Sequence, residues 1–249
     1  MSTLQGKTAV ITGGGTGIGL ACARRLAADG ARVVLMARAL DRLETAAAGI
    51  EDARAIAVDV TDDESVQAAF DAAGPVDILV NNAGIAGAKA FRKLSMEDWH
   101  RYQAVNVDGV VRCSQAVLGH MEGADYARIV NMASIAGLGG GAYIAPYSAS
   151  KHAVIGLTRS LALEYARTNL TVNAVCPGYV ETEIVESAVA NIMEKTGRTR
   201  EQATAELTKH NPQGRLIQPD EVAEAVAWLC SPLSRSVSGQ AITINGGDA

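Results

Sequence analysis

The feature that most constrains the fold of this chain is a regular alternation of short apolar segments with longer amphipathic ones. The short segments are rich in Val, Ile and Ala, as buried strands are, and the longer ones repeat apolar residues at helical spacing. Strands are predicted at 7–12, 32–36, 53–58, 76–80, 128–132, 170–175 and 240–244. Helices are predicted at 17–29, 40–48, 62–73, 95–121, 146–167 and 220–230. Because the helices supply the crossovers that parallel strands require, this order predicts a parallel sheet.

We therefore expect an α/β fold: one Rossmann-type domain over residues 1–249, with a doubly wound parallel sheet of about seven strands and helices on both faces. The length of 249 residues suits one such domain, and no repeat, low-complexity tract or linker divides the chain. Residues 181–216 interrupt the alternation, because the segment is far longer than the roughly 2–6 residues of an ordinary α/β loop. We interpret it as one or two amphipathic helices that form a lid over the substrate.

A glycine-rich loop joins the first predicted strand to the first helix. Its sequence fits the spacing G-x-x-x-G-x-G through Gly13, Gly17 and Gly19, and does not fit G-x-G-x-x-G. Glycine lets the backbone approach a pyrophosphate closely, and the helix N-terminus presents free N–H groups to the phosphates. The position between a strand and a helix favours a dinucleotide site over a plain glycine-rich turn.

Polar residues follow the ends of three later strands. Asp59-Val60 follows the third, Asn81-Asn82-Ala83-Gly84 the fourth, and Ser134 the fifth. Open α/β sheets bind ligands in the crevice at the carboxyl ends of their strands. These residues are candidates for that site, although Asn, Asp and Gly are also common in ordinary turns.

Tyr147 and Lys151 are predicted to act as an acid/base pair, because they are four residues apart on one face of a helix. A free tyrosine has a pKa of about 10, and a neighbouring ammonium lowers that pKa towards working pH. Ser134 is expected to polarise a carbonyl oxygen in the same crevice. Asn106 lies inside a predicted helix, where a buried amide needs hydrogen-bond partners.

Together, these motifs resemble those of the short-chain dehydrogenase/reductase family, in the same order and over nearly the whole chain. The resemblance implies that Tyr147 is the general acid/base and that Ser134 hydrogen-bonds the substrate oxygen. It also implies that Lys151 binds the nicotinamide ribose and lowers the tyrosine pKa, and that Asn106 holds a water in a proton relay. The matching stretches are Thr12-Gly13-x-x-x-Gly17-Ile18-Gly19, Asp59-Val60, Asn81-Asn82-Ala83-Gly84, Asn106, Ser134, Tyr147-x-x-x-Lys151, Pro177-Gly178-x-x-x-Thr182 and Asn245-Gly246-Gly247.

The resemblance further implies a set of cofactor contacts. Asp59, Val60 and Asn82 are expected to line the adenosine side of the cofactor, and Val180 and Thr182 to meet the nicotinamide carboxamide. The full set is Gly13, Gly15, Thr16, Gly17, Ile18, Gly19, Arg38, Asp59, Val60, Asn82, Ala83, Gly84, Tyr147, Lys151, Pro177, Gly178, Val180 and Thr182.

The leading hypothesis is an enzyme that interconverts a ketone and a secondary alcohol by hydride transfer. Residues 145–152 and 172–178 are similar to polyketide and acyl ketoreductases, which keeps a 3-oxoacyl-thioester reductase or 3-hydroxyacyl dehydrogenase open. A dinucleotide sensor without catalysis is a third reading, against which the intact catalytic set argues. A hydrolase is disfavoured because no G-x-S-x-G elbow occurs. The expected substrate pocket is mostly apolar, formed by Leu138, Tyr143, Tyr179, Ile184 and Met193.

The cofactor is expected to be NADP(H), with NAD(H) as the alternative. NAD-selective sites place an acid at the end of the second strand to bind the ribose 2′-hydroxyl, whereas this chain has Ala37 there. Arg38 follows and is suited to pair with a 2′-phosphate. Thr16 argues against this choice, because many NADP-dependent relatives carry a cation at that position of the loop.

Composition excludes several other classes of protein. The net charge of −5 provides no basic field for nucleic acid or an anionic membrane. The four cysteines and four histidines are scattered without metal-ligand spacing, so we expect no metal site and interpret the cysteines as buried thiols. No signal peptide or membrane span is visible, which indicates a cytoplasmic protein. The family resemblance implies a homotetramer built partly by packing its long helices, 95–121 and 146–167, against their copies; the sequence alone leaves a dimer as the alternative.

Overall fold

The computed structural model describes residues 3–209 and 211–248; Met1, Ser2, His210 and Ala249 lie outside the described residues. Its strands form one parallel sheet in the order β3-β2-β1-β4-β5-β6-β7, which confirms the predicted doubly wound architecture. Two halves of the sheet run outwards from β1 and β4, so the switch of direction lies between these two strands. The strands are β1 (Thr8–Thr12), β2 (Arg32–Ala37), β3 (Ala53–Ala57), β4 (Ile78–Asn81), β5 (Ala127–Met132), β6 (Leu170–Pro177) and β7 (Ala241–Ile244).

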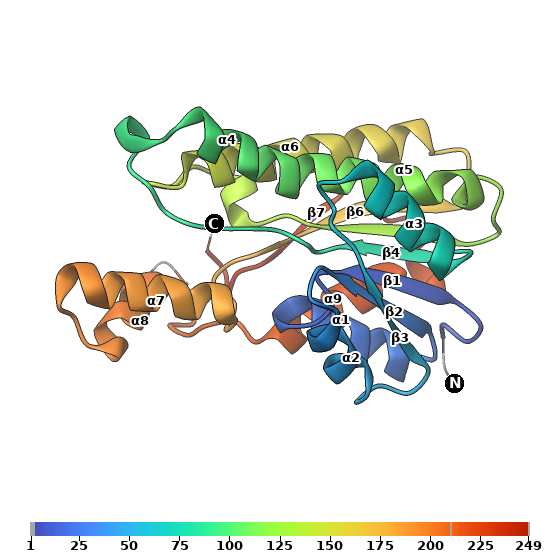
Figure 1. Cartoon of the computed structure of the whole chain (residues 1–249), viewed down its shortest axis with the longest axis horizontal. Coiled ribbons are helices and arrows are strands. Elements are labelled where there is room, and N and C mark those ends of the chain that lie inside the picture. The colour runs from blue at the N-terminus through green and yellow to red at the C-terminus, as the bar shows by residue number, and fades with distance from the viewer. Residues whose placement is uncertain (1–2, 210, 249) are drawn as a thin grey trace.

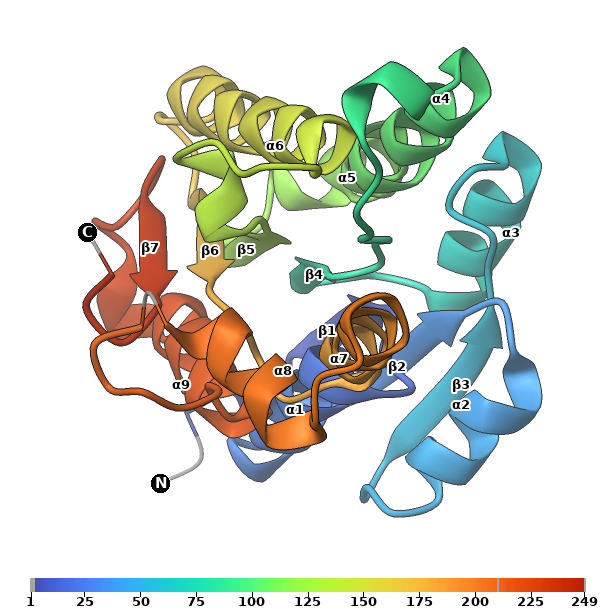
Figure 2. The same ribbon diagram turned by 90° about the vertical axis from the view of Figure 1, so that its left-hand side faces the viewer.

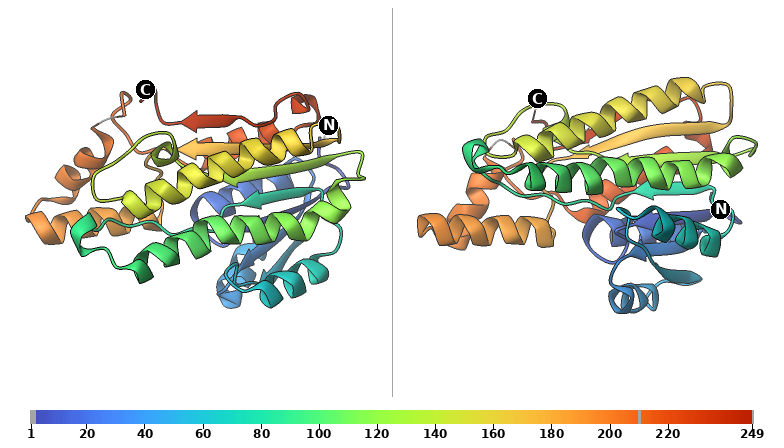
Figure 3. Two further views of the ribbon diagram at one scale, coloured as in Figure 1. Left: turned by 90° about the horizontal axis from the view of Figure 1, so that it is seen from above. Right: turned by 45° about the horizontal axis from the view of Figure 1, so that its top comes forward.

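Helices cover both faces of this sheet. In Figure 1 the helices α1 (Gly17–Ala28), α2 (Leu40–Ala47) and α9 (Pro219–Cys230) lie below the strands. On the opposite face lie α3 (Asp63–Ala73), α4 (Met96–Gln103), α5 (Gly109–Met121) and α6 (Ala145–Glu164). The two longest of these, α5 and α6, run side by side in Figure 3.

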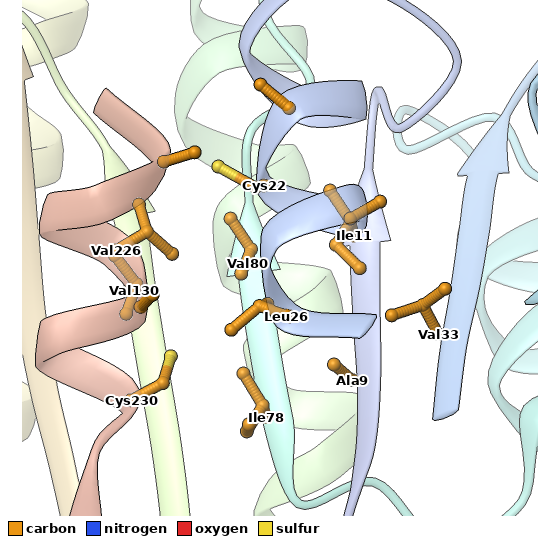
Figure 4. Close-up of a cluster of buried hydrophobic side chains, with 14 of the residues drawn as sticks. Ala9, Ile11, Cys22, Leu26, Val33, Ile78, Val80, Val130, Val226 and Cys230 are labelled. Carbon is orange, nitrogen blue, oxygen red and sulfur yellow. The ribbon is translucent and has the colours of Figure 1, made fainter. Parts of the chain in front are cut away.

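The core follows from the alternation of side chains along each central strand. Ile11 of β1 packs with Leu26 of α1 and Val226 of α9 on one face, whereas its neighbour Val10 belongs to the cluster on the other face (Figure 4). Successive side chains of a strand point to opposite faces, so a strand covered on both sides buries both of its faces. Every residue of β1, β4, β5 and β6 is accordingly buried.

The cysteines lie in this core, as predicted: all four are free and buried. Burial disfavours the thiolate and raises the pKa of Cys113 to about 12 and that of Cys176 to about 11. Such thiols are inert packing residues.

The segment predicted as one helix at 95–121 differs in the structure. It begins with a capping box in which the Ser95 hydroxyl and the Asp98 carboxylate each accept a hydrogen bond from the other's backbone N–H. It is then interrupted by a five-residue π-helix, Ala104–Asp108, between α4 and α5. Single π turns of this kind are frequent at functional sites, and this one contains Asn106.

Residues 181–216 contain two helices, α7 (Glu183–Thr196) and α8 (Arg200–Thr208). Gly197 ends α7 with a left-handed φ of 69°, and the Thr199–Gln202 capping box begins α8. In Figure 1 both helices project beyond the strands on the left, and in Figure 2, which faces that side, they lie in front of the strands. None of the helices within 3–209 and 211–248 has the length and apolar character that crossing a membrane requires.

Candidate active site

The glycine loop between β1 and α1 is shaped by close backbone contacts. Gly13 and Gly17 have left-handed φ angles of 64° and 51°, which glycine adopts without strain. A Cβ atom at Gly19 would lie 2.2 Å from the Gly13 carbonyl oxygen and 2.5 Å from Nδ2 of Asn82. The loop therefore leaves a backbone-lined cradle at the N-terminus of α1, which is the geometry that binds a pyrophosphate.

Gly19→Ala is expected to destabilise the fold by about 1–3 kcal/mol, because two backbone segments must move apart to admit the methyl group. In a domain of this size, each kcal/mol lowers Tm by about 2–4 °C. The measurement is a thermal melt with and without NADPH, and we also expect NADPH to bind at least about tenfold more weakly. Gly119→Ala in α5 is the control, since nothing lies within 4 Å of its Cβ position. Equal Tm values for Gly19→Ala and the wild type would contradict this description of the loop.

Asn82, predicted to line the adenosine side of the cofactor, uses its side chain to hold this loop. Its Nδ2 donates to the carbonyl oxygens of Thr12 (3.0 Å) and Gly13 (3.1 Å). The Thr12 hydroxyl accepts hydrogen bonds from the backbone N–H groups of Asn82 and Ala83, both at 3.0 Å. Both N–H bonds of the Asn82 side-chain amide are thus engaged by the protein, and Asn82 fixes the glycine loop to the end of β4.

A hollow of about 500 Å³ opens beside the glycine loop, at the end of β2 and the start of α2. Arg38 lines it with an exposed side chain, next to the small Ala37. Arg42 also lines it, a residue that the sequence analysis missed; its position four residues after Arg38, in a helix beginning at Leu40, was the available signal. The full lining is Gly13, Gly15, Thr16, Ala37, Arg38, Ala39, Arg42 and Leu43.

Asp59 and Val60 lie after β3, and both make local contacts. The Asp59 carboxylate accepts hydrogen bonds from the backbone N–H (2.9 Å) and hydroxyl (2.7 Å) of Thr61, which lower its pKa. The Arg38 charge adds a smaller lowering of the same pKa. Val60 is buried against Gly109, where a Cβ would lie 2.9 Å from Cγ2 of Val60. Val60 therefore sets the spacing between this loop and α5.

Ser134 and Tyr147 are brought together by the turn that follows β5. The Ser148 hydroxyl donates to the carbonyl oxygens of Ala136 (2.6 Å) and Gly139 (3.1 Å), which fastens this turn to the start of α6. At Gly137 a Cβ would lie 2.7 Å from the Lys151 carbonyl oxygen, so only glycine permits the close approach. The Ser134 hydroxyl consequently lies near enough to the phenol of Tyr147 to lower the phenol's pKa.

The pKa shifts of Tyr147 and Lys151 differ from the sequence-based expectation. Burial raises the pKa of Tyr147, and the hydrogen bond from Ser134 lowers it by less. Burial also lowers the pKa of Lys151 to about 8. Lys151 Nζ donates to the Met132 carbonyl oxygen (2.7 Å) and lies 5.8 Å from the centroid of the Tyr147 ring. The expected lowering of the tyrosine pKa by Lys151 is therefore wrong for this structure, because desolvation of the phenolate outweighs every attractive contact.

Asn106, in the π-helix, connects the loop after β4 to the helix that carries Tyr147. Its Nδ2 donates to the Ile85 carbonyl oxygen and the Ser150 hydroxyl, both at 3.0 Å, and its Oδ1 accepts from the Ile85 N–H at 2.8 Å. The Ser150 hydroxyl in turn donates to the Tyr147 carbonyl oxygen at 2.7 Å. Gly84 lies against this group, since a Cβ there would be 3.3 Å from Asn106 Oδ1 and 3.7 Å from Lys151 Nζ. The side chain of Asn106 is thus engaged by the protein and is completely buried.

The end of β6 completes the crevice. The Ser134 hydroxyl donates to the Pro177 carbonyl oxygen at 3.5 Å, and the Gly178 N–H donates to the Ile244 carbonyl oxygen at 3.0 Å. A Cβ at Gly17 would lie 3.1 Å from Cγ2 of Thr182, so the segment after β6 reaches the glycine loop. Val180 is buried and contributes packing at this point. The predicted site residues therefore gather along one edge of the sheet, at the carboxyl ends of its strands.

Comparison with known proteins assigns the family. The sequence model described as short chain dehydrogenase matches residues 7–193. The chain belongs to this family. A Streptomyces coelicolor protein named as a ketoacyl reductase is 43% identical, with 99% of this chain and 98% of that protein covered. The cis-4-hydroxycyclohexanecarboxylate dehydrogenase of Sinomonas cyclohexanicum is 40% identical, with 97% and 96% covered.

A solved structure agrees with this membership of the short-chain dehydrogenases. A crystal structure of an actinorhodin polyketide ketoreductase variant with NADPH matches with a TM-score of 0.93 and 42% identity, covering 99% of this chain and 98% of that one. The chain is accordingly an NAD(P)-dependent oxidoreductase that interconverts ketones and secondary alcohols, as the sequence predicted.

Proposed function

We propose that this short-chain dehydrogenase reduces an apolar ketone with NADPH, and that Tyr147 gives the proton to the carbonyl oxygen. The observation that carries the proposal is that Ser134, Tyr147 and Lys151 lie together at the same sheet edge as the glycine cradle: Ser134 influences the phenol's pKa, and Lys151 Nζ is 5.8 Å from the centroid of its ring. Side chains at Gly13 and Gly19 would collide with Asn82 and with the loop's own backbone, so glycine is needed for the tight loop that faces the hollow and begins α1, where a dinucleotide pyrophosphate can bind free N–H groups. When bound, the dihydronicotinamide supplies the hydride.

The residues of this site bind the substrate and cofactor and transfer the proton. Ser134 hydrogen-bonds the carbonyl oxygen and Tyr147 protonates it as negative charge develops there. Lys151 binds the nicotinamide ribose through its ammonium group, which the Met132 carbonyl oxygen already holds in place. Asn106 holds α6 and the loop after β4 in register, and membership of the family assigns it the further role of holding a water in the proton relay. The glycine loop from Gly13 to Gly19 binds the pyrophosphate.

We also propose the remaining cofactor contacts. Asp59, Val60, Asn82, Ala83 and Gly84 follow β3 and β4 and are assigned to the adenosine side and the middle of the cofactor. Pro177, Gly178, Val180 and Thr182 lie at and after the end of β6 and are assigned to the nicotinamide end. These assignments rest on the arrangement at the sheet edge and on membership of the family.

NADPH is favoured over NADH by the hollow beside the loop. Arg38 lines it, no acid does, and the similar actinorhodin ketoreductase structure contains NADPH. Arg38→Gln is expected to lower the ratio of kcat/KM for NADPH to that for NADH by about tenfold or more, since a charge-assisted hydrogen bond contributes about 1.5–3 kcal/mol. Arg24→Gln, an exposed arginine of α1 outside the hollow, is the control. A wild type that prefers NADH, or an unchanged ratio in the Arg38 variant, would contradict the NADPH assignment.

The substrate pocket is proposed to bind the apolar body of the ketone. Large apolar side chains are unusually exposed near the catalytic edge, and Tyr143 among them has a strained φ of 69°. They are Leu138, Tyr143, Tyr179, Ile184 and Met193. A 3-oxoacyl thioester is the second candidate, supported by the ketoacyl reductase relative. Turnover of paired aryl ketones and 3-oxoacyl thioesters under identical conditions separates the two.

We further propose that residues 181–216 form a lid. The side chains of Val185, Val189, Ala203 and Leu207 form a small cluster of their own, distinct from the main core. The two ends of the segment lie side by side and form a narrow neck, in which the Glu181 N–H donates to the Ile217 carbonyl oxygen at 2.9 Å. A self-packed pair of helices on a narrow neck is suited to move as one unit over the site.

A homotetramer in the cytoplasm is the proposed assembly and location. The outer face of α6 exposes small residues, including Ala153, Gly156 and Ser160, and then Leu163. Small side chains let a second helix approach closely, and closed symmetric assemblies are common among soluble enzymes. Light scattering of the purified chain gives the stoichiometry.

A further inference from the structure

We propose that Arg42 is a second binding group for the cofactor 2′-phosphate, and that Glu183 of the lid competes with the phosphate for it. Arg42 lines the same hollow as Arg38, and its Nη2 donates to Oε1 of Glu183. Glu183 is the first residue of α7. This inference rests on the proposed use of NADPH, and it assigns to α7 a role in cofactor selection.

The position of the pair connects the hollow to the base of the lid. Thr182, which precedes Glu183, lies against the glycine loop at Gly17. The end of α7 nearer the sheet accordingly faces α1 and α2 in Figure 1. Arg42 therefore lines the hollow proposed for the phosphate and also reaches the Glu183 carboxylate.

The relative strengths of two interactions decide whether Arg42 binds the Glu183 carboxylate or the 2′-phosphate. The side chains of Arg42 and Glu183 are 59% and 63% exposed, and an ion pair that water reaches so freely contributes little to stability. A phosphate dianion accepts two parallel hydrogen bonds from a guanidinium and binds it more strongly than one carboxylate oxygen does. The 2′-phosphate is therefore expected to displace Glu183.

Two consequences follow from this competition. Glu183 lowers the apparent affinity for a 2′-phosphate, because the ion pair between Arg42 and Glu183 must break before the phosphate binds Arg42. Release of Glu183 also removes the ion pair that holds the first turn of α7 to α2, so the adenosine end of the cofactor influences the mobility of the lid. NADH lacks the phosphate and leaves the pair intact.

The test compares the affinities of adenosine 2′,5′-bisphosphate and adenosine 5′-monophosphate by titration calorimetry, which needs no turnover. Arg42→Gln is expected to weaken bisphosphate binding about five- to tenfold and to leave the monophosphate unchanged. Glu183→Gln is expected to tighten bisphosphate binding about threefold, and to have no effect when Arg42 is already glutamine. Glu186→Gln is the matched control, because Glu186 also lies in the first turn of α7 but pairs with Arg200.

Hydrogen exchange provides the second readout. Exchange in residues 183–196 should rise when the wild type binds the bisphosphate, stay constant with the monophosphate, and not respond to the bisphosphate in Glu183→Gln. Unchanged bisphosphate affinity in both Arg42→Gln and Glu183→Gln would overturn the inference, as would equal effects on the two nucleotides.

The same titrations distinguish this inference from the proposed function. If Arg38→Gln weakens the bisphosphate and the Arg42 and Glu183 variants do not, NADPH use stands and only the role of Arg42 and Glu183 fails. If the wild type binds both nucleotides equally, NADPH preference and this inference fail together.

Discussion

Tyr147→Phe is expected to slow ketone reduction by about 10²–10⁴-fold, the usual contribution of a general acid, while leaving NADPH affinity nearly unchanged. The substitution removes one hydroxyl, whose pKa Ser134 influences at the sheet edge, and leaves the aromatic ring in place. Single-turnover reduction with NADPH, together with a separate binding titration, measures the two quantities. Tyr165→Phe, at the opposite end of α6, is the control and should keep its rate.

The raised pKa of Tyr147 sets the direction of the pH dependence. Reduction requires the protonated phenol, which a raised pKa maintains throughout the neutral range. Oxidation of the alcohol requires the phenolate, so its rate should increase as the pH rises. A Tyr147→Phe variant with near wild-type turnover would contradict the assignment of the acid.

Lys151→Met is expected to abolish turnover and yet to make the protein more stable at pH 7. Burial lowers the Lys151 pKa from 10.5 to about 8, so holding the charged ammonium in the core costs about 3 kcal/mol below pH 8. Methionine has similar length and no charge, but it leaves the Met132 carbonyl oxygen without its donor, which costs about 1 kcal/mol. The net gain is therefore about 1–2 kcal/mol, or a Tm several degrees higher.

The gain should depend on pH with a definite sign. Between pH 8 and 10.5 the unfolded wild type binds more protons at Lys151 than the folded protein does, so wild-type stability rises across this window. The advantage of Lys151→Met is consequently greatest below pH 8 and declines as the pH approaches 10.5. Thermal melts of both proteins at pH 7 and pH 10 measure the difference. A variant less stable at pH 7, or an advantage that grows with pH, would contradict the cost assigned to the buried ammonium.

Much of the fold was predictable because its signals are local. The fully buried strands appear as runs of Val, Ile and Ala, and helix ends carry recognisable residues such as Ser95 and Gly197. The π-helix at Ala104–Asp108 was not predictable, because it depends on bonds from Asn106 to Ile85 and Ser150, which are distant in sequence. Long-range partners of this kind leave no periodic signal.

The site shows the same division between local and long-range information. The spacing of Tyr147 and Lys151 indicated a shared helix face, which the structure has. Their pKa values depend on the depth of burial, which the spacing does not report, and the expected direction for Tyr147 was wrong. Asn82 was assigned to the cofactor from its place after a strand, and the sequence did not indicate that its amide also holds Thr12 and Gly13. Arg42 was missed although it follows Arg38 by four residues, whereas its contact with Glu183, 141 residues away, has no signal in the sequence.

The central claim is that this chain transfers a hydride from NADPH to a ketone, with Tyr147 as the acid. The most direct measurement uses NADPH deuterated at the reactive C4 position, with an apolar ketone, and analyses the product by mass spectrometry and NMR. The account predicts an alcohol with one deuterium on the carbinol carbon for each NADPH oxidised, and loss of this product in Tyr147→Phe. NADPH that binds tightly but delivers no deuterium to any ketone or 3-oxoacyl thioester would contradict it.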